Sequence, residues 1–449
     1  MGTLVMVQLD VIQENANTEV GSYFVANYPP FSAWGPEHKQ AVIDGLGQKP
    51  GPDSTPLGLY IHIPFCRKRC HFCYFRVYTD RNSGEIEQYL EALTREIELY
   101  SRQPYLQDRD FEFVYFGGGT PSYLSGDQLR GLVDRINRHW RWEKASEVTF
   151  ECEPGTLKKS KLEAIKEIGV TRLSLGIEHF DDDVLEINGR AHRSPEVLRA
   201  YEWAREVGFD QINVDLIAGM AGDTDAKWED TVAKTLALKP DNLTVYQMEV
   251  PQNSTLAREA RESNGAVPIA DWPTKRKWVQ QAFDEFCKSG YEVSSAYTVV
   301  KSNNEGNGFY YRDSLWRGAD MIGTGVASFS YANGIHFQNE GGWADYLDAI
   351  ANEQLPVARA LPATDQQRMI RELVLQHKLG KVNAGYFRDK FNVEIATVYA
   401  DVYDAMKKSK FAEIDGDQIQ LTPQGLLRID ALLPYFFEPA YRSELPDGN

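Results

Sequence analysis

Six strand-like segments alternate with helix-like segments along the middle of this chain, and no other feature limits the possible folds as strongly. The predicted strands are Leu59–Pro64, Phe111–Phe116, Glu147–Cys152, Arg172–Gly176, Gln211–Ile217 and Asn242–Val250. Apolar residues at helical spacing predict helices between these strands. The predicted helices are Glu85–Tyr100, Gly126–Trp140, Lys158–Ile168, a stretch up to Glu206, Trp228–Leu238 and Thr274–Ser289. Such alternation predicts an α/β fold: a full or partial TIM-like (β/α)6 barrel with a parallel sheet inside and helices outside.

Polar and glycine-rich residues follow these strands in turn. In barrels of this kind, functional groups gather at the carboxyl ends of the strands. The residues at the six ends are a cysteine loop after Pro64, Gly117–Pro121, Glu151 with Glu153, Glu178, Asp215, and Tyr246–Glu249. Six such ends in succession predict one shared site.

Three cysteines lie within eight residues at the end of the first predicted strand. Cys66, Cys70 and Cys73 have the spacing CxxxCxxC, with Phe72 just before the last of them. Three thiolates on one loop can hold three irons of a 4Fe–4S cluster and leave the fourth iron open. An open iron can chelate S-adenosylmethionine, whose reductive cleavage gives methionine and a 5′-deoxyadenosyl radical. A zinc site, completed by His62 or His71, and a set of structural thiols are the alternatives.

Charge and composition exclude several classes of protein. The 449 residues carry a net charge of −17, which argues against a nucleic acid or an anionic membrane as the main partner. No apolar run could span a bilayer and no secretory signal opens the chain, so we expect a cytoplasmic protein. The five cysteines are an odd number and do not suit a disulfide framework. We expect Cys152 and Cys287 to be buried small hydrophobes.

The chain divides into four parts. Residues 1–57 form an aromatic extension and a Gly/Pro-rich linker, 58–300 the barrel, 301–359 a glycine-punctuated segment, and 360–449 a C-terminal module. The module is predicted to contain helices Gln366–Leu379, Asn383–Phe391, Ile395–Ser409 and Pro423–Leu433, and a hairpin of Phe411–Ile414 and Gln418–Leu421. This order is typical of a winged helix. Because the chain is acidic, covering the barrel mouth is favoured over binding DNA.

With these residues assembled, the chain resembles the oxygen-independent coproporphyrinogen III oxidase family of radical S-adenosylmethionine enzymes over roughly residues 57 to 435. The matching motifs are YIHIPFC at Tyr60–Cys66, FGGGTPSYL at Phe116–Leu124, FECEPGTL at Phe150–Leu157, RLSLGIEHF at Arg172–Phe180, NGRAH at Asn188–His192, INVDLIAGM at Ile212–Met220, LTVYQMEV at Leu243–Val250, GADMIGTGVASFS at Gly318–Ser330 and HFQN at His336–Asn339.

The resemblance implies roles for residues of these motifs. The expected cofactor-binding residues are Tyr60, Phe72, Gly118, Gly119, Thr120, Glu151, Arg190, Asp215 and Met248, and the expected catalytic residues are Glu178, Asp215 and Tyr311. Among them, Gly118 to Thr120 would hold the methionine amino group and Arg190 would pair with its carboxylate. Some branches of the family bind a second S-adenosylmethionine, and the segment 301–359, with Phe309–Trp316 and Gly323–Ser330, would help to form that site or the substrate site.

Three departures from the family pattern indicate the branch. The oxidases carry a further cysteine where this chain has Phe75, and the heme-chaperone branch carries a His-Asn stretch where this chain reads Tyr311 to Trp316 without histidine. The usual glutamine of the fourth strand is Glu178. The remaining branch transfers a methyl or methylene carbon to an sp2 carbon and uses two S-adenosylmethionine molecules held close together. The alternatives are a coproporphyrinogen oxidase, a heme-delivery protein and a winged-helix regulator.

The implied partners follow from this branch. We expect a small, aromatic or apolar substrate and an electron donor such as flavodoxin or ferredoxin. We expect no nucleic-acid partner, no membrane span and a monomer.

Overall fold

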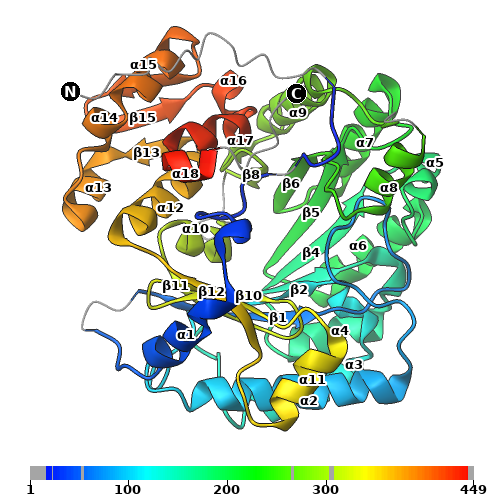
Figure 1. Cartoon of the computed structure of the whole chain (residues 1–449). Helices are drawn as coiled ribbons and strands as arrows, with labels where there is room; N and C mark the ends of the chain where they lie inside the picture. Colours follow the sequence, from blue (N-terminus) through cyan, green and yellow to red (C-terminus); the bar gives the residue numbers. More distant parts are fainter. Residues whose placement is uncertain (1–16, 23, 52–54, 264–266, 303–307, 443–449) are drawn as a thin grey trace.

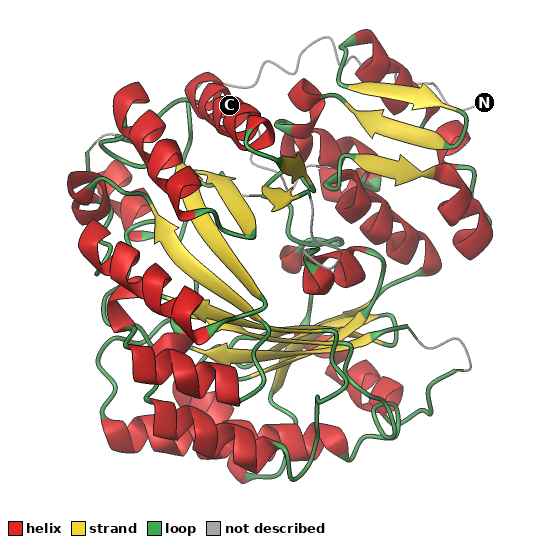
Figure 2. Ribbon diagram, turned by 180° about the vertical axis from the view of Figure 1, so that it is seen from behind, coloured by secondary structure: helices red, strands yellow, loops and turns green. Residues whose placement is uncertain are grey.

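The structure is a computed structural model, and it describes residues 17–22, 24–51, 55–263, 267–302 and 308–442. None of the described helices has the length and apolar character needed to cross a membrane. Figures 1 and 2 show a curved sheet with helices on its outer side and a smaller α+β module beside it.

Six parallel strands form the centre of the molecule and confirm the predicted partial barrel. They are β1 (Leu57–Ile63), β2 (Phe113–Gly118), β3 (Glu147–Cys152), β4 (Arg172–Glu178), β5 (Gln211–Ala218) and β6 (Asn242–Gln247), each paired with the next. The outer helices are α2 (Ser83–Ser101), α3 (Gly126–Ile136), α4 (Lys159–Glu167), α5 (Asp182–Ile187), α6 (Ser194–Val207), α7 (Asp225–Leu238), α8 (Thr255–Glu262) and α9 (Trp272–Lys288), with the 3-10 turns η4 (Pro121–Tyr123) and η5 (Pro154–Thr156) between them.

Alternation along the strands separates a packed outer face from a functional inner face. Leu59 and Ile61 of β1 are completely buried under the helices. Tyr60, between them, is only partly buried, and so are Glu151 of β3 and Asp215 of β5, because these side chains face the interior of the barrel. The inner face therefore presents polar and aromatic groups to an internal space.

The sheet extends beyond the six predicted strands on both edges. β9 (Asp320–Thr324) pairs parallel to β1 and is followed outward by β10 (Phe329–Ala332), β11 (Ile335–Asn339) and β12 (Val357–Pro362). On the other edge, β8 (Thr298–Lys301) pairs antiparallel to β6 and carries β7 (Tyr291–Val293). Two further helices, α10 (Tyr310–Trp316) and α11 (Trp343–Ala351), complete this region.

The sixth strand is shorter than predicted. It ends at Gln247, where the Met248 N–H donates the last hydrogen bond of the β5–β6 pairing to the Ala218 carbonyl, and the chain then forms a bridge between Val250 and Val20. The prediction for Cys287 is also wrong. This side chain at the end of α9 is exposed, whereas Cys152 is buried as expected.

The N-terminal segment contains η2 (Phe31–Ala33), η3 (Pro36–His38) and α1 (Lys39–Leu46). The C-terminal module contains α12 (Asp365–His377), β13 (Lys381–Asn383), α13 (Ala384–Phe391), α14 (Ile395–Val398), α15 (Ala400–Lys408), β14 (Ala412–Asp415), β15 (Gln418–Leu421), α16 (Pro423–Leu426), α17 (Ile429–Leu432), η6 (Leu433–Phe436) and α18 (Pro439–Arg442). Val25 and Tyr28 belong to the hydrophobic core of the module. The N-terminal segment, dark blue in Figure 1, thus runs between the module and the barrel.

Candidate active site

The three cysteines lie on the loop after β1, at one side of a cavity of about 340 Å³ inside the barrel. The Thr120 hydroxyl donates a hydrogen bond to Cys66 Sγ, and the Arg190 guanidinium donates one to Cys70 Sγ, each with a donor–acceptor distance of 3.3 Å. Hydrogen bonds from neutral or cationic donors stabilise sulfur that carries negative charge. In the absence of a metal, burial raises the pKa of the Cys66 thiol to about 12 and the pKa of the Cys73 thiol to about 11.

This arrangement fits a cubane cluster. Among the described residues, no group of three or more His, Cys, Asp or Glu side chains is close enough to share a single metal ion. A cubane needs one thiolate for each of three irons, so its cysteines do not converge on one point. Cys66, Cys70 and Cys73 all border the cavity, so a cluster held by them would face its interior.

Backbone hydrogen bonds join the glycine-rich turn after β2 to the end of β1 and the start of the cysteine loop. The Gly119 N–H donates to the carbonyl of Ile63, and the Thr120 N–H donates to that of Phe65. Gly118 has a φ of +109°, and a Cβ there would lie 2.4 Å from the His62 ring. Only glycine fits this close approach, which holds the turn against the cavity wall.

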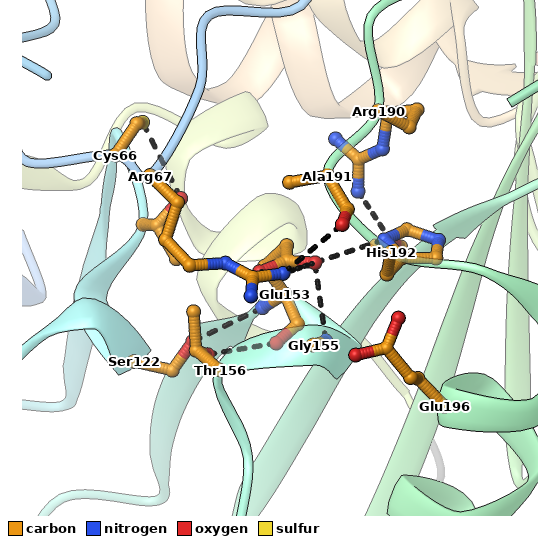
Figure 3. A network of polar contacts seen from close by, with 12 residues as sticks. Cys66, Arg67, Ser122, Glu153, Gly155, Thr156, Arg190, Ala191, His192 and Glu196 are labelled. Atoms are coloured by element: carbon orange, nitrogen blue, oxygen red, sulfur yellow. Dashed lines mark hydrogen bonds and ion pairs between the residues drawn. The ribbon is translucent and has the colours of Figure 1, made fainter. Parts of the chain in front are cut away.

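A buried carboxylate network fixes the cysteine loop on its other side, as Figure 3 shows. Glu153 at the end of β3 accepts hydrogen bonds from the Gly155 N–H and the His192 ring, and it pairs with Arg67 over 3.2 Å. Burial would raise the pKa of Glu153, but the His192 hydrogen bond and the nearby arginines lower it to about 2. Glu153 therefore remains ionised and ties the loop to the ends of β3 and β4.

Glu151 and Asp215 place two more carboxyl groups on the inner wall. Glu151 accepts hydrogen bonds from the Tyr115 hydroxyl at 2.7 Å and from the Gly118 N–H at 3.3 Å. Burial, with the repulsion of Asp215, raises the pKa of Glu151 to about 7. Asp215 accepts hydrogen bonds from Ser174 and Asn213, and burial raises its pKa as well. Carboxylates of this kind suit ribose hydroxyls or a cationic ligand.

Glu178 and Arg190 form the third polar element of the wall. Arg190 donates to the Gly176 carbonyl at 2.6 Å and lies 3.5 Å from a Glu178 oxygen. Glu178 follows a bulge in β4 and has a φ of +66°, a left-handed conformation that costs energy for a residue with a side chain. Burial raises the pKa of Glu178 to about 7, although Arg190 opposes the shift. The ion pair with Arg190 is one contact that stabilises Glu178 in this conformation.

Most of the residues predicted for the site border this one cavity. From the predicted set, the lining contains Cys66, Cys70, Phe72, Cys73, Gly118, Gly119, Thr120, Glu151, Glu178, Arg190, Asp215 and Met248.

Tyr60 and Tyr311 do not border the cavity, but both contact Tyr115. The Tyr60 ring stacks on the Tyr115 ring with a centroid distance of 5.8 Å, and the Tyr311 ring is tilted against it at 4.4 Å. Both rings therefore support the Tyr115–Glu151 pair. The segments Phe309–Trp316 and Gly323–Ser330 contribute no residue to the lining.

Several lining residues had no assigned role in the sequence analysis. Phe24, Tyr74, Ser174, Tyr246 and Glu249 all border the cavity. Phe24 comes from the N-terminal segment, whose aromatic content was a signal for it. The alternation along β4 was a signal for Ser174, and the strand-end position was a signal for Tyr246 and Glu249, whereas the signal for Tyr74 was its place next to Cys73.

A parallel six-stranded barrel with an open three-cysteine loop defines a radical S-adenosylmethionine protein. Residues 60–234 match the family model described as the radical SAM superfamily. The chain is 30% identical to the heme chaperone HemW of Bacillus subtilis over 372 residues, which cover 82% of this chain and 96% of that protein.

The chain belongs to the coproporphyrinogen III oxidase and HemW family of that superfamily. It is also 26% identical to the oxygen-independent coproporphyrinogen III oxidase of Synechocystis sp., over 91% of each chain. The solved coproporphyrinogen III oxidase of Escherichia coli shares the fold with a TM-score of 0.80 and 23% identity, and the match covers 92% of this chain and 96% of that one. Membership of this superfamily implies a 4Fe–4S cluster and S-adenosylmethionine as cofactors.

Proposed function

We propose that this radical S-adenosylmethionine enzyme uses two S-adenosylmethionine molecules to transfer a methyl or methylene carbon to an sp2 carbon of a small substrate. The observation that carries the proposal is the charge of the cavity. Glu151, Glu178 and Asp215 line its interior, and a bound cation would favour the ionised form of each of them. Each S-adenosylmethionine brings a cationic sulfonium, which carboxylates attract. Two such cations suit this wall.

The positively charged side chains that border the cavity do not neutralise its carboxylates. Arg67, Lys68 and Arg69 all belong to the cysteine loop, where their side chains are exposed at its surface. Arg67 is already paired with Glu153, and Arg190 with Glu178. A coproporphyrinogen carries four carboxylates, which would meet like charge inside this cavity.

The chain's own residues have distinct parts in this proposal. When bound, the cluster and its S-adenosylmethionine supply a 5′-deoxyadenosyl radical. Cys66, Cys70 and Cys73 hold the cluster, and Arg190 orients the methionine carboxylate. Glu151 and Asp215 hold hydroxyl or cationic groups of the cofactors. We propose an external electron donor such as flavodoxin or ferredoxin for the reducing electron.

The residue at the oxidase's extra cysteine position also favours carbon transfer. Phe75 borders the cavity and stacks on Tyr74, with ring centroids 4.5 Å apart. A phenyl ring cannot replace a thiol in proton or hydrogen transfer. It can exclude water and contact an apolar substrate.

The names of the relatives favour a second candidate function, which is the conversion or binding of a tetrapyrrole. The three relatives described above are two coproporphyrinogen III oxidases and one heme chaperone. This candidate predicts either oxidative decarboxylation of coproporphyrinogen III or tight binding of heme without consumption of S-adenosylmethionine.

One set of assays separates the candidates. The anaerobically reconstituted protein is given S-adenosylmethionine, a reductant and a metabolite extract, and the products are quantified by mass spectrometry. Carbon transfer predicts S-adenosylhomocysteine and 5′-deoxyadenosine in comparable amounts. Conversion of coproporphyrinogen III to protoporphyrinogen IX without S-adenosylhomocysteine, or heme binding without cofactor cleavage, would establish the second candidate instead.

A further inference from the structure

A second cavity of about 320 Å³ adjoins the first one and is called the annex here. It lies between the end of β6, the N-terminal segment, the start of α9 and the C-terminal module. Phe24, Tyr246, Gln247 and Glu249 border both cavities, so the two spaces meet at these side chains. A substrate could therefore extend from the annex into the cavity that the cysteine loop borders.

Aromatic rings from three distant parts of the chain form one wall of the annex. Tyr246 and Tyr297 lie nearly parallel, with centroids 6.2 Å apart, and Phe24 lies 6.4 Å from Tyr297. Tyr246 is 39% exposed although it lies at the end of a central strand, because it faces the two cavities. A flat ring stacks favourably on such a wall.

The charged groups around the annex already have protein partners. Asp430 pairs with Lys378 at 2.8 Å and accepts hydrogen bonds from the Val25 N–H and the Tyr297 hydroxyl. Lys275, buried beside the annex residue Trp272, donates to the Met248 carbonyl at 2.7 Å. Glu19, Arg276 and Arg428 also border the annex, and all three interact within the protein. A charged ligand would have to compete with these contacts.

Two neutral polar groups remain at the junction of the cavities. Gln247 donates its Nε2 to the Leu427 carbonyl, but its buried Oε1 has no hydrogen-bond partner among the described residues. A buried acceptor without a partner is costly, so this oxygen favours a ligand with an N–H or O–H group. Burial, together with Asp430, raises the pKa of Glu249 to about 8. Glu249 is therefore mostly protonated at neutral pH and can donate a hydrogen bond.

We propose that the annex binds the part of the substrate that does not react, and that this part is a neutral aromatic ring with a hydroxyl or N–H group. The ring stacks on Tyr246, its donor contacts Gln247 Oε1, and an oxygen or nitrogen of the ligand accepts from Glu249. The inference rests on the proposed function, because it places the reacting carbon in the first cavity.

The test measures binding to the reconstituted full-length protein by equilibrium dialysis, without reductant. The probes are 2-naphthol, which is neutral and donates a hydrogen bond, 2-naphthoate, which is anionic, and naphthalene. We expect 2-naphthol to bind at least tenfold more tightly than either of the others. Equal or tighter binding of 2-naphthoate would overturn the proposal.

Substitutions in the lining show which of the two cavities binds 2-naphthol. Tyr246→Ala and Trp272→Leu should weaken 2-naphthol binding about tenfold, whereas Cys287→Ala, at an exposed position outside both cavities, should leave it unchanged. Glu249→Gln retains a donor and should retain binding, whereas Glu249→Ala should lose it. A loss confined to Phe75→Leu, at a position that borders only the first cavity, would place the ring outside the annex and contradict the proposal.

The outcome is separable from that of the proposed function, because no cofactor is cleaved in the dialysis. Selective 2-naphthol binding would support the annex even if carbon transfer were disproved. Carbon transfer to a substrate whose ring carries a carboxylate in the annex would overturn this inference alone.

Discussion

Among single residues, Cys70 has the contact that most directly tests the cluster site. Its sulfur accepts a hydrogen bond from Arg190, and it borders the cavity between the other two cysteines of the motif. Cys70→Ala removes one of three iron ligands. We expect the reconstituted wild type to bind about four irons per chain and the variant to lose the cluster, as measured by iron content and absorbance.

The matched control is Cys287→Ala. Cys287 is exposed on α9 and has no contact with the cavity. It should keep the full iron content. Stoichiometric zinc with no iron–sulfur signal in the wild type would contradict the cluster assignment.

Gly118 tests the close packing of the glycine turn. Gly118→Ala combines a φ of +109° with a Cβ only 2.4 Å from the buried His62 ring. An unfavourable φ alone costs about 1–2 kcal/mol, so we expect at least about 2 kcal/mol of lost stability and weaker binding of S-adenosylmethionine. In Gly131→Ala, within α3, the new Cβ meets no atom within 4 Å. This control should be neutral or stabilising by up to about 1 kcal/mol. Equal unfolding temperatures and cofactor affinities for the two variants would refute this account of the turn.

At the scale of elements, α2 supports the Gly325 turn after β9 through one buried carboxyl group. Glu96 accepts hydrogen bonds from the Gly325 N–H, the Asn339 amide and the Tyr346 hydroxyl at 2.6–2.7 Å. Burial raises its pKa to about 7 from 4.5. The folded state thus holds a proton that the unfolded state releases between pH 4.5 and 7.

This difference gives a pH dependence with a definite sign. Over that window the Glu96 contribution falls as pH rises, by at most about 1.4 kcal/mol per pH unit, and it is constant above the folded pKa. Glu96→Gln should cost about 1–3 kcal/mol at pH 5.5, because its NH2 group faces donors. The difference in melting temperature between the two proteins should shrink toward pH 7.5. A gap that stays constant with pH would be inconsistent with the raised pKa.

The same elements show how far the sequence could predict the fold. The strands β1 to β6 combine apolar alternation with helices between them, so the barrel was predictable. β9 to β12 were not predicted, because short strands such as Phe329–Ala332 are defined by pairing with distant strands rather than by a local pattern. Likewise, no local signal shows that β6 ends at Gln247, since Val250 then pairs with Val20, which is remote in sequence.

The candidate site was predictable where function follows strand ends. Motif positions identified the cysteines, Glu151, Arg190 and Asp215, and the structure brings them to one cavity. The contribution of Phe24 depends on how the N-terminal segment threads between barrel and module, which the sequence does not specify. The left-handed φ of Glu178 depends on a bulge in β4, and the sequence does not predict it either.

In the whole molecule, an ion pair within the C-terminal module, Lys378 with Asp430, forms hydrogen bonds to Val25 of the N-terminal segment and to Tyr297 before β8. Lys378 is 2% exposed and contacts Asp430, which also accepts hydrogen bonds from Val25 and Tyr297. Asp430→Asn leaves a buried cation without its counter-charge, which typically costs about 3–5 kcal/mol. We expect faster hydrogen exchange in 366–437 and loss of product formation while cofactor cleavage continues.

Asp365→Asn is the control for this prediction. Asp365 also forms an ion pair, with Arg368, but its side chain is 95% exposed, so the change should cost less than about 0.5 kcal/mol. If Asp430→Asn keeps full coupling between cofactor cleavage and product formation, the module does not act as a cover for the site. Specific duplex DNA binding that is lost in this variant would favour a regulatory role instead.

Methyl-deuterated S-adenosylmethionine tests the central claim, carbon transfer with two cofactors, most directly. In the proposed reaction, the 5′-deoxyadenosyl radical takes its hydrogen from the methyl group of a second S-adenosylmethionine. We predict that 5′-deoxyadenosine from the reconstituted enzyme carries one deuterium and accompanies a comparable amount of S-adenosylhomocysteine. Unlabelled 5′-deoxyadenosine with no S-adenosylhomocysteine, together with decarboxylation of coproporphyrinogen III, would contradict the account.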